Sequence, residues 1–278
     1  MPELPEVETI RRELASKIVG HRLVGVELFW PKAVREPSPE EFCRRIAGQS
    51  IEGIGRRGKY MIFRLSGGDV MILHLKMTGV LLLMPASQRI QNHTTAIFKL
   101  DGGTCLHFID QRKFGALWLV EDEDMVVGKL GPEPLDASFT PSVLRQLVGK
   151  RRMPIKALLC DQQTIAGIGN MYADEALFAA RIHPLKAANI LSDMEIEHLH
   201  SGIIEVLQRG IKNKGASIAN YLRPGGEKGD AQTEFKVAHR RGETCFVCGS
   251  PLSRISIRGR GTYFCPVCQR GETQPVML

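Results

Sequence analysis

Residues 245–268 read CFVCGSPLSRISIRGRGTYFCPVC, and this stretch defines the last module of the chain. It holds two Cys-x-x-Cys pairs separated by 16 residues. Two-residue spacing lets both thiolates of a pair reach one ion, and four thiolates satisfy the tetrahedral coordination of zinc. Because sulfur fills every position, we predict one structural Zn²⁺ rather than a catalytic ion. The predicted ligands are Cys245, Cys248, Cys265 and Cys268.

The alternatives for these pairs are two disulfide bonds or a redox-active dithiol, and neither suits a chain that we expect to be cytoplasmic. Three further cysteines, Cys43, Cys105 and Cys160, stand alone in apolar contexts. We predict that they are reduced, buried small hydrophobes. Gly249, directly after the first pair, suits the tight turn of a zinc knuckle.

The stretch between the cysteine pairs is predicted to be a β-hairpin with RGRG (258–261) at or near its turn. Arg260 offers a planar fork that can hold a phosphate through two hydrogen bonds. A solvated, arginine-rich loop is the alternative. The region from His239 to Arg270 also carries six arginines against one acid, Glu243; they are Arg240, Arg241, Arg254, Arg258, Arg260 and Arg270.

Upstream of this module, four segments have apolar residues at helical spacing. They are SVLRQLVG (142–149), IKALLCDQ (155–162), NMYADEALFAARI (170–182) and SDMEIEHLHSGIIEVLQRGI (192–211). The proline-rich GPEPLDASFTP (131–141) is predicted to be a linker, and the glycine-rich 212–235 a partly mobile loop.

Between residues 22 and 120 the chain changes to short apolar runs with glycine-containing breaks. The runs are RLVGVELFW (22–30), YMIFRL (60–65), VMILHL (70–75), VLLLM (80–84), TAIFKL (95–100) and CLHFI (105–109). Many short strands joined by tight turns favour an antiparallel sandwich or barrel. The chain is therefore predicted to be a multi-domain α+β protein.

The N-terminal segment has one apolar stripe at helical period, formed by Val7, Ile10, Leu14 and Ile18. Removal of Met1 would leave Pro2 with a secondary amine at the start of this helix. An α-amino group titrates near pH 8, and the positive end of the helix dipole favours its neutral, nucleophilic form. Glu3 and Glu6 lie close enough in sequence to supply acid and base functions. A proline and a glutamate that merely start a helix are the alternative.

Composition sets broad limits on function. The 278 residues are 43% hydrophobic and 24% charged, with a formal net charge of +7. This balance is typical of a globular protein and compatible with a polyanionic partner. No apolar run approaches the roughly 20 residues that span a bilayer, and the N-terminus has no signal-peptide core. We expect a cytoplasmic protein without a membrane partner.

Six segments of the chain resemble the formamidopyrimidine-DNA glycosylase family, the bacterial enzymes that act on 8-oxoguanine and formamidopyrimidines. They are MPELPEVETI (1–10), RRGKY (56–60), HLKMTG (74–79), DQRKFG (110–115), DQQTIAGIGNMYADEALF (161–178) and GRGTYFCPVCQR (259–270). The resemblance implies an N-terminal antiparallel β-sandwich with flanking helices, a helix–two-turn–helix domain and a β-hairpin zinc finger. The corresponding division is 1–130, a linker at 131–142, 143–236, 237–271 and a tail at 272–278.

The resemblance also implies roles for individual residues. Pro2 is expected to be a Schiff-base nucleophile, Glu3 the principal acid/base and Glu6 a second acid. Lys59 is expected beside the lesion and its phosphate. The residues expected to contact DNA are His74, Met77, Arg112, Phe114, Lys156, Asn170 and Arg260, with Arg260 clamping the phosphates of a flipped nucleotide. Taken singly, several have ordinary alternatives: core packing, a salt bridge, a helix cap at Asn170 or a surface lysine at position 156.

The implied function is a monomeric, bacterial base-excision-repair enzyme bound to the nucleoid. It would excise oxidised purines from double-stranded DNA and then cleave the strand by β,δ-elimination. Two rivals stay open: an endonuclease VIII-like enzyme for oxidised pyrimidines, which Leu4 disfavours, and a non-catalytic zinc-finger damage sensor. The chain also departs from the family, with Val237-Ala238-His239-Arg240 where a Tyr-Gly-Arg run is usual and with the added tail GETQPVML (271–278).

Overall fold

The structure is a computed structural model that describes residues 1–270. The chain forms two compact units. The first unit contains residues 1–129 and 210–232, and the second contains residues 130–209 and those described from 233 onward. The loop after residue 210 thus packs with the N-terminal unit, whereas the sequence-based division placed 143–236 in one domain. The expected tail, 272–278, lies outside the described residues.

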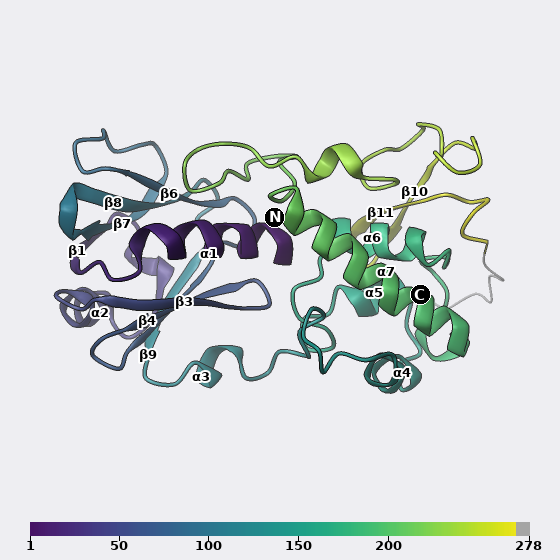
Figure 1. Cartoon of the computed structure of the whole chain (residues 1–278), viewed down its shortest axis with the longest axis horizontal. Coiled ribbons are helices and arrows are strands. Elements are labelled where there is room, and N and C mark those ends of the chain that lie inside the picture. Colours follow the sequence, from purple (N-terminus) through teal and green to yellow (C-terminus); the bar gives the residue numbers. More distant parts are fainter. Residues whose placement is uncertain (271–278) are drawn as a thin grey trace. The chain divides into compact units, whose positions relative to one another are not determined.

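The first unit begins with helix α1 (Leu4–Ile18), which runs along the sheets of that unit (Figure 1). The predicted stripe of Val7, Ile10, Leu14 and Ile18 is confirmed, because each of these side chains is at most 1% exposed. Burying an aliphatic side chain of this size contributes about 1.5–3 kcal/mol. This stripe therefore holds the N-terminus firmly on the unit's core.

The strands of the first unit form two sheets, in agreement with the sandwich predicted from the many short apolar runs. One has the order β1-β7-β8-β6 and the other β2-β9-β5-β4-β3. Their bounds are β1 (Leu23–Leu28), β2 (Val34–Glu36), β3 (Ile51–Arg57), β4 (Tyr60–Leu65), β5 (Val70–His74), β6 (Gly79–Pro85), β7 (Thr94–Leu100), β8 (Thr104–Asp110) and β9 (Ala116–Val120). Neighbouring strands are antiparallel except β2, which pairs parallel with β9.

The core of the first unit lies between the two sheets and under α1. Phe98 and Phe108 project from one sheet, Phe63 and Leu117 from the other, and all four are fully buried. Two short helices complete the unit, α2 (Pro39–Ile46) and α3 (Asp124–Val127). The arrangement is a β-sandwich with flanking helices, as expected.

The second unit is helical, with α4 (Pro141–Gly149), α5 (Ile155–Leu159), α6 (Asn170–Ala179) and most of α7 (Asp193–Lys212). These helices match the four periodic segments of the sequence. In the part of the chain that the structure describes, residues 1–270, no helix is long and apolar enough to span a membrane.

A two-stranded sheet closes the second unit, formed by β10 (Ser253–Ile257) and β11 (Arg260–Phe264). The turn residues Arg258 and Gly259 have φ of +47° and +73°. Positive φ at both central positions is typical of a type I′ turn, which matches the twist of a hairpin. The hairpin predicted at RGRG is therefore confirmed.

Candidate active site

The start of α1 places Pro2, Glu3 and Glu6 together in the first unit. The helix begins at Leu4 with Glu3 as its N-cap residue, so Pro2 lies two residues before the helix instead of in its first turn. Pro2 is buried, Glu3 is 2% exposed and Glu6 is fully buried, whereas Met1 is half exposed. Two carboxylates are thus held in a largely dehydrated setting beside the N-terminal proline.

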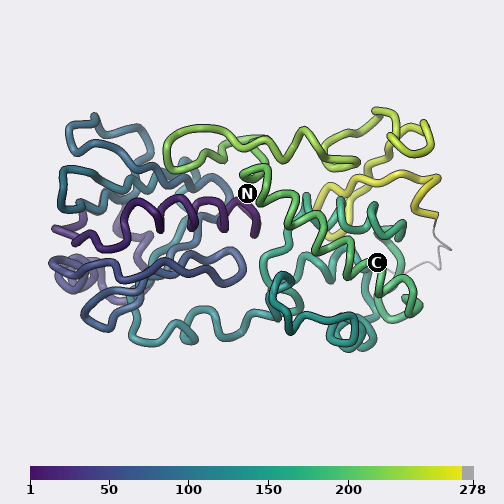
Figure 2. Tube along the Cα trace, viewed as in Figure 1, coloured from purple at the N-terminus to yellow at the C-terminus, as the bar shows by residue number. Residues whose placement is uncertain are grey.

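The Glu6 carboxylate joins the N-terminus to a distant loop. Its two oxygens accept hydrogen bonds from the backbone N–H groups of Glu3, at 2.7 Å, and of Ala216, at 2.8 Å. Gly215 has φ of +79°, and a Cβ there would lie 2.9 Å from Glu6 Cγ. Only glycine fits this approach without strain. Figure 2 shows this loop returning beside the start of α1.

Lys59 lies in the two-residue turn between β3 and β4. The register pairs Arg57 with Tyr60, which leaves Gly58 and Lys59 as the central turn residues. Gly58 has φ of +55°, as the first central position of a type II′ turn requires. Lys59 is only 5% exposed. Its position is therefore set by a tight turn rather than by a free loop.

His74 ends β5, directly opposite Tyr60, whose ring meets the imidazole edge-on with 4.5 Å between ring centroids. The Lys76 backbone N–H donates to His74 Nδ1 at 2.8 Å. Burial, followed by the charges of Lys76 and Lys59, lowers the pKa of His74 to about 3. The ring is neutral near pH 7, and because Nδ1 accepts, Nε2 carries the proton and can donate.

Met77, Arg112 and Phe114 lie together on the surface of the first unit. Arg112 Nη1 lies 3.0 Å from Met77 Sδ, and its guanidinium lies 4.6 Å from the centre of the Phe114 ring. Met77 is 45% exposed and Phe114 is 47% exposed. Core packing, the ordinary alternative for both apolar residues, is therefore wrong. A cation and two large apolar side chains instead form one exposed cluster.

Asp110 holds the two loops that carry this cluster. It is fully buried and accepts hydrogen bonds from Thr78 Oγ1, from Arg112 N at 3.2 Å and from Gly115 N at 2.6 Å. A Cβ at Gly115 would lie 2.3 Å from Phe108 Cζ, so glycine is required there. Asp110 begins the DQRKFG segment, but the sequence alone predicts no role for it. Its place directly before the loop that carries Arg112 was the signal in the sequence that could have indicated this role.

Lys156 lies inside the second unit, so its interpretation as a surface lysine is wrong. It is 1% exposed, and its ammonium donates to the Asp174 carboxylate and to the Asn170 carbonyl oxygen. Burial raises the pKa of Asp174 to about 7, against the lowering effects of Lys156 and of the Tyr263 N–H. The ion pair therefore lies beneath the start of α6.

Asn170 is the first residue of α6, and Gly169 is its N-cap, so the helix-cap interpretation of Asn170 is wrong. Its side-chain amide donates to Gly261 O at 2.7 Å, and Asp174 accepts from Tyr263 N at 3.1 Å. Both partners are on β11. The start of α6 and the hairpin are thus held together by two hydrogen bonds, and this contact was not foreseen from the sequence.

Arg260 begins β11 and is exposed. The next residue is Gly261, where a Cβ would lie 2.6 Å from Arg254 Nη2. The absence of a side chain at Gly261 therefore lets the Arg254 side chain cross the hairpin. Three arginines, at positions 254, 258 and 260, therefore crowd one short hairpin. Such a surface is suited to an anion.

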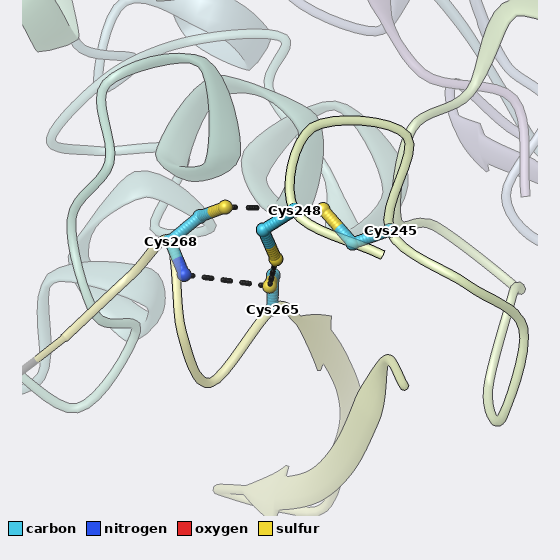
Figure 3. Close-up of side chains that lie close together, drawn as sticks. All are labelled: Cys245, Cys248, Cys265 and Cys268. Carbon is cyan, nitrogen blue, oxygen red and sulfur yellow. Dashed lines mark hydrogen bonds between the residues drawn. The ribbon is translucent and has the colours of Figure 1, made fainter. Parts of the chain in front are cut away.

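The four predicted zinc ligands converge, as Figure 3 shows. Their sulfur atoms all lie within 4.8 Å of one another, with Cys245–Cys268 at 3.8 Å and Cys248–Cys265 at 3.5 Å. Ligands at 2.3 Å on a tetrahedron lie about 3.8 Å apart, so the spacing fits one zinc ion. Gly249 has φ of +74°, as the expected knuckle turn requires. The remaining cysteines, Cys105 and Cys160, are buried, but Cys43 is only half-buried.

Family models match the chain in three consecutive regions. Residues 1–117 match the formamidopyrimidine-DNA glycosylase N-terminal domain, residues 130–221 match the H2TH domain of the same family, and residues 242–271 match a zinc finger found in FPG and IleRS. The chain belongs to the formamidopyrimidine-DNA glycosylase family. The four cysteines are accordingly the site of one structural zinc ion.

Relatives of this glycosylase family match over nearly the whole chain. The formamidopyrimidine-DNA glycosylase of Chloroflexus aurantiacus is 46% identical, covering 99% of this chain and 100% of the relative. That of Desulfitobacterium hafniense is 45% identical, with 97% and 100% covered. A solved complex of Lactococcus lactis Fpg with DNA containing an abasic site is 39% identical, with a TM-score of 0.91 over 97% of this chain and 100% of that chain. A complex of an L. lactis FPG mutant with DNA containing Fapy-dG has the same identity and coverage and a TM-score of 0.92.

Proposed function

We propose that this glycosylase excises oxidised purines, 8-oxoguanine and formamidopyrimidines, from duplex DNA and then cleaves the strand as an abasic-site lyase. The single observation that carries the proposal is the exposed Met77–Arg112–Phe114 cluster. Removing a base from a duplex requires that the base be rotated out, at a cost of a few kcal/mol. Apolar wedges inserted from the minor groove and a hydrogen-bonding arginine offset part of that cost.

The proposed chemistry begins at Pro2 after Met1 has been removed. The neutral amine attacks the sugar C1′, forming an N–C1′ bond while the damaged base leaves with the electrons of the glycosidic bond and takes up the proton that the Pro2 nitrogen loses. Glu3 protonates the sugar ring oxygen as the ring opens. The resulting iminium acidifies the adjacent sugar carbon, whose proton returns to the Glu3 carboxylate as the 3′ phosphate leaves, and the 5′ phosphate is eliminated in a second such step. Hydrolysis of the iminium then frees Pro2.

The other residues of the first unit support binding and orientation. His74, neutral with its proton on Nε2, is suited to donate one hydrogen bond to a phosphate oxygen. Lys59, in its tight turn, is proposed to lie beside the lesion and its phosphate. Glu6, bonded to the backbone of Glu3 and Ala216, is proposed to orient the catalytic N-terminus rather than to transfer protons itself.

In the second unit, Asn170 and Arg260 are proposed to hold DNA phosphates. The first turn of a helix presents free N–H groups to an anion, and an arginine fork adds two more donors. Lys156 is proposed to support Asn170 from inside, because its buried ammonium already contacts the Asn170 carbonyl oxygen and Asp174. The zinc ion is structural and keeps the hairpin that carries Arg260 folded. We place the enzyme, as a monomer, on the DNA of a bacterial cytoplasm.

Cleavage of matched duplexes tests the proposal. One duplex carries 8-oxoguanine opposite cytosine, one carries thymine glycol and one carries an abasic site. The proposal expects cleavage of the first and third, with phosphate at both ends of a one-nucleotide gap. Preference for thymine glycol would favour an endonuclease VIII-like specificity. Tight binding without any product would leave a non-catalytic damage sensor.

A further inference from the structure

Glu8, which the proposed mechanism does not use, lies at the centre of a group of three arginines in the first unit. Its Oε1 accepts from Arg11 Nη2 at 2.7 Å and from Arg12 Nε at 2.6 Å. Its Oε2 accepts from Arg11 Nε at 2.9 Å and from Arg56 Nε at 3.2 Å. Glu8 is only 8% exposed. The two carboxylate oxygens thus accept four hydrogen bonds, all from arginines. This arrangement suits an ionised group that holds cations in place and not one that transfers a proton.

The protonation state of Glu8 agrees with a purely electrostatic role. Burial alone would raise its pKa, but hydrogen bonds from Arg11 and Arg12 and the nearby charges of Arg11 and Arg56 lower the pKa to about 2. Glu8 is therefore ionised at any pH at which the enzyme is expected to work. A carboxylate that stays charged can hold arginines in place but cannot act as a general acid.

Arg56 connects Glu8 with the turn that holds Lys59, because its guanidinium donates to both. While Arg56 Nε donates to Glu8, its Nη1 donates to Gly58 O at 2.9 Å. That carbonyl belongs to the peptide unit joining Gly58 to Lys59. Because a peptide unit is planar, a hydrogen bond that restrains its oxygen also restrains the N and Cα positions of Lys59.

Glu8 belongs to the same helix that begins after Pro2 and Glu3. Along that helix, Arg11 reaches β3 as well, with Nη1 donating to Ile54 O at 3.4 Å. One buried carboxylate on α1 therefore connects the helix that directly follows the proposed nucleophile with strand β3 and with the turn that bears Lys59. All of these contacts lie within the first unit.

We infer that Glu8 is a positioning residue that, through Arg56, sets the Gly58–Lys59 turn at a fixed place relative to the N-terminus of α1. The inference rests on the proposed function, in which Lys59 acts beside the lesion. Reaction rates are sensitive to displacements of about 1 Å in the groups that orient a substrate, with costs near a hundredfold. A turn released by loss of Glu8 should therefore slow base excision without abolishing binding.

The test compares Glu8→Gln with Arg56→Lys, each made in the wild-type and in the Lys59→Ala background. Arg56→Lys keeps a positive charge beside Glu8 but has no fork with which to reach Gly58 O as well. The matched control is Glu41→Gln, which removes a carboxylate that pairs with two arginines on α2 in the same unit. Each protein is measured for the single-turnover rate of 8-oxoguanine excision, for DNA affinity and for amide hydrogen exchange at residues 57–60.

We expect Glu8→Gln and Arg56→Lys to lower the single-turnover rate at least about tenfold while the dissociation constant changes less than about threefold. In the Lys59→Ala background each should have an effect of less than about twofold, because residues acting through one another are non-additive. Exchange at the turn should rise in both variants and stay unchanged in the control. Arg56→Lys keeps the test valid if Glu8→Gln does not fold.

An unchanged rate, or a full effect of Glu8→Gln retained in the Lys59→Ala background, would overturn the inference. Unchanged exchange at residues 57–60 would overturn it independently of activity. The proposed function fails in a different way, namely if the wild-type protein cleaves neither 8-oxoguanine nor abasic duplexes. In that case increased exchange at the turn still supports the structural link from Glu8 to Lys59.

Discussion

Glu6 Oε1 accepts a hydrogen bond from the backbone N–H of Ala216 at 2.8 Å, across 210 residues of chain. The same carboxylate accepts from Glu3 N at 2.7 Å, so it joins the start of α1 to the loop that follows α7. Tyr221 reinforces this contact, since its hydroxyl donates to Lys214 O at 2.9 Å and its ring lies in the core. The loop and the N-terminus that carries the proposed nucleophile therefore form one structural element.

Replacing Glu6 by Gln should loosen this element. A glutamine of the same size has one oxygen, so its amide group would face one of the two N–H donors and leave that buried donor unsatisfied. Such a group costs roughly 1–3 kcal/mol. We expect a lower melting temperature and faster amide exchange at residues 214–217, whereas Glu41→Gln on α2 should change neither. Equal exchange at this loop in wild type and Glu6→Gln would contradict the role of Glu6.

His74 should make the first unit sensitive to acid. Its pKa is about 3 in the folded protein and near 6.5 when unfolded, so between these values the unfolded chain binds one more proton. The contribution of His74 to the free energy of unfolding is therefore fully present above pH 6.5 and is lost as the pH falls toward 3. At pH 4.5 the loss from this group is about 2–3 kcal/mol. His74→Asn, whose side-chain oxygen can replace Nδ1 as acceptor, should lose less stability between pH 7 and pH 4.5 in urea unfolding. If His74→Asn lost as much free energy of unfolding as the wild type over this pH range, the buried, neutral state of the His74 ring would be contradicted.

The buried Lys156–Asp174 pair should be sensitive to loss of one partner. Lys156→Met leaves a carboxylate without its cation in a site that is 1% exposed, and breaking such a pair costs roughly 3–5 kcal/mol. The matched control is Lys186→Met, because Lys186 pairs with Glu195 where both side chains are about one quarter exposed. An exposed pair of that kind contributes at most about 1 kcal/mol. Chemical denaturation that shows equal losses for the two variants would contradict this interpretation.

The salt dependence of DNA binding separates a supporting role of Lys156 from a direct phosphate contact. Each phosphate contact adds about one to the slope of log K against log salt concentration. Arg260→Met should reduce that slope by about one, because Arg260 is exposed on the hairpin. Lys156→Met should weaken binding with its slope unchanged. A slope reduced equally by both variants would place the Lys156 ammonium on a phosphate.

Removing one cysteine pair should eliminate the zinc ion and, with it, DNA binding. Cys245→Ser/Cys248→Ser leaves two of four ligands, and structural zinc sites contribute directly to folding. We expect metal analysis to find no zinc and DNA affinity to fall at least about a hundredfold, by analogy with the large effect of lost metal sites. Cys43→Ser, outside the cysteine cluster, should keep one zinc per chain. Full zinc content in the double variant would contradict the assignment.

The spacing of residues in the sequence predicted local structure well and tertiary contacts poorly. Spacing was sufficient for the α1 stripe, the RGRG hairpin and the cysteine cluster, because each depends on residues close in sequence. It could not show that Lys156 is buried, since burial depends on Asp174, 18 residues away, and on the packing of α6. Nor could it reveal that Glu6 meets Ala216 or that Asp110 holds the two loops of the exposed cluster. These contacts arise only when distant segments fold together.

Borohydride trapping on a duplex that carries 8-oxoguanine opposite cytosine tests directly whether Pro2 forms the covalent intermediate. Wild type, Pro2→Gly and Glu3→Gln are compared, with Pro5→Ala as a matched proline control in the first turn of α1. We expect a covalent protein–DNA band for wild type and for Pro5→Ala, and a strongly reduced band for Pro2→Gly. An undiminished band from Pro2→Gly, or no band from wild type lacking Met1 that nevertheless binds the duplex tightly, would contradict the role of Pro2 as nucleophile.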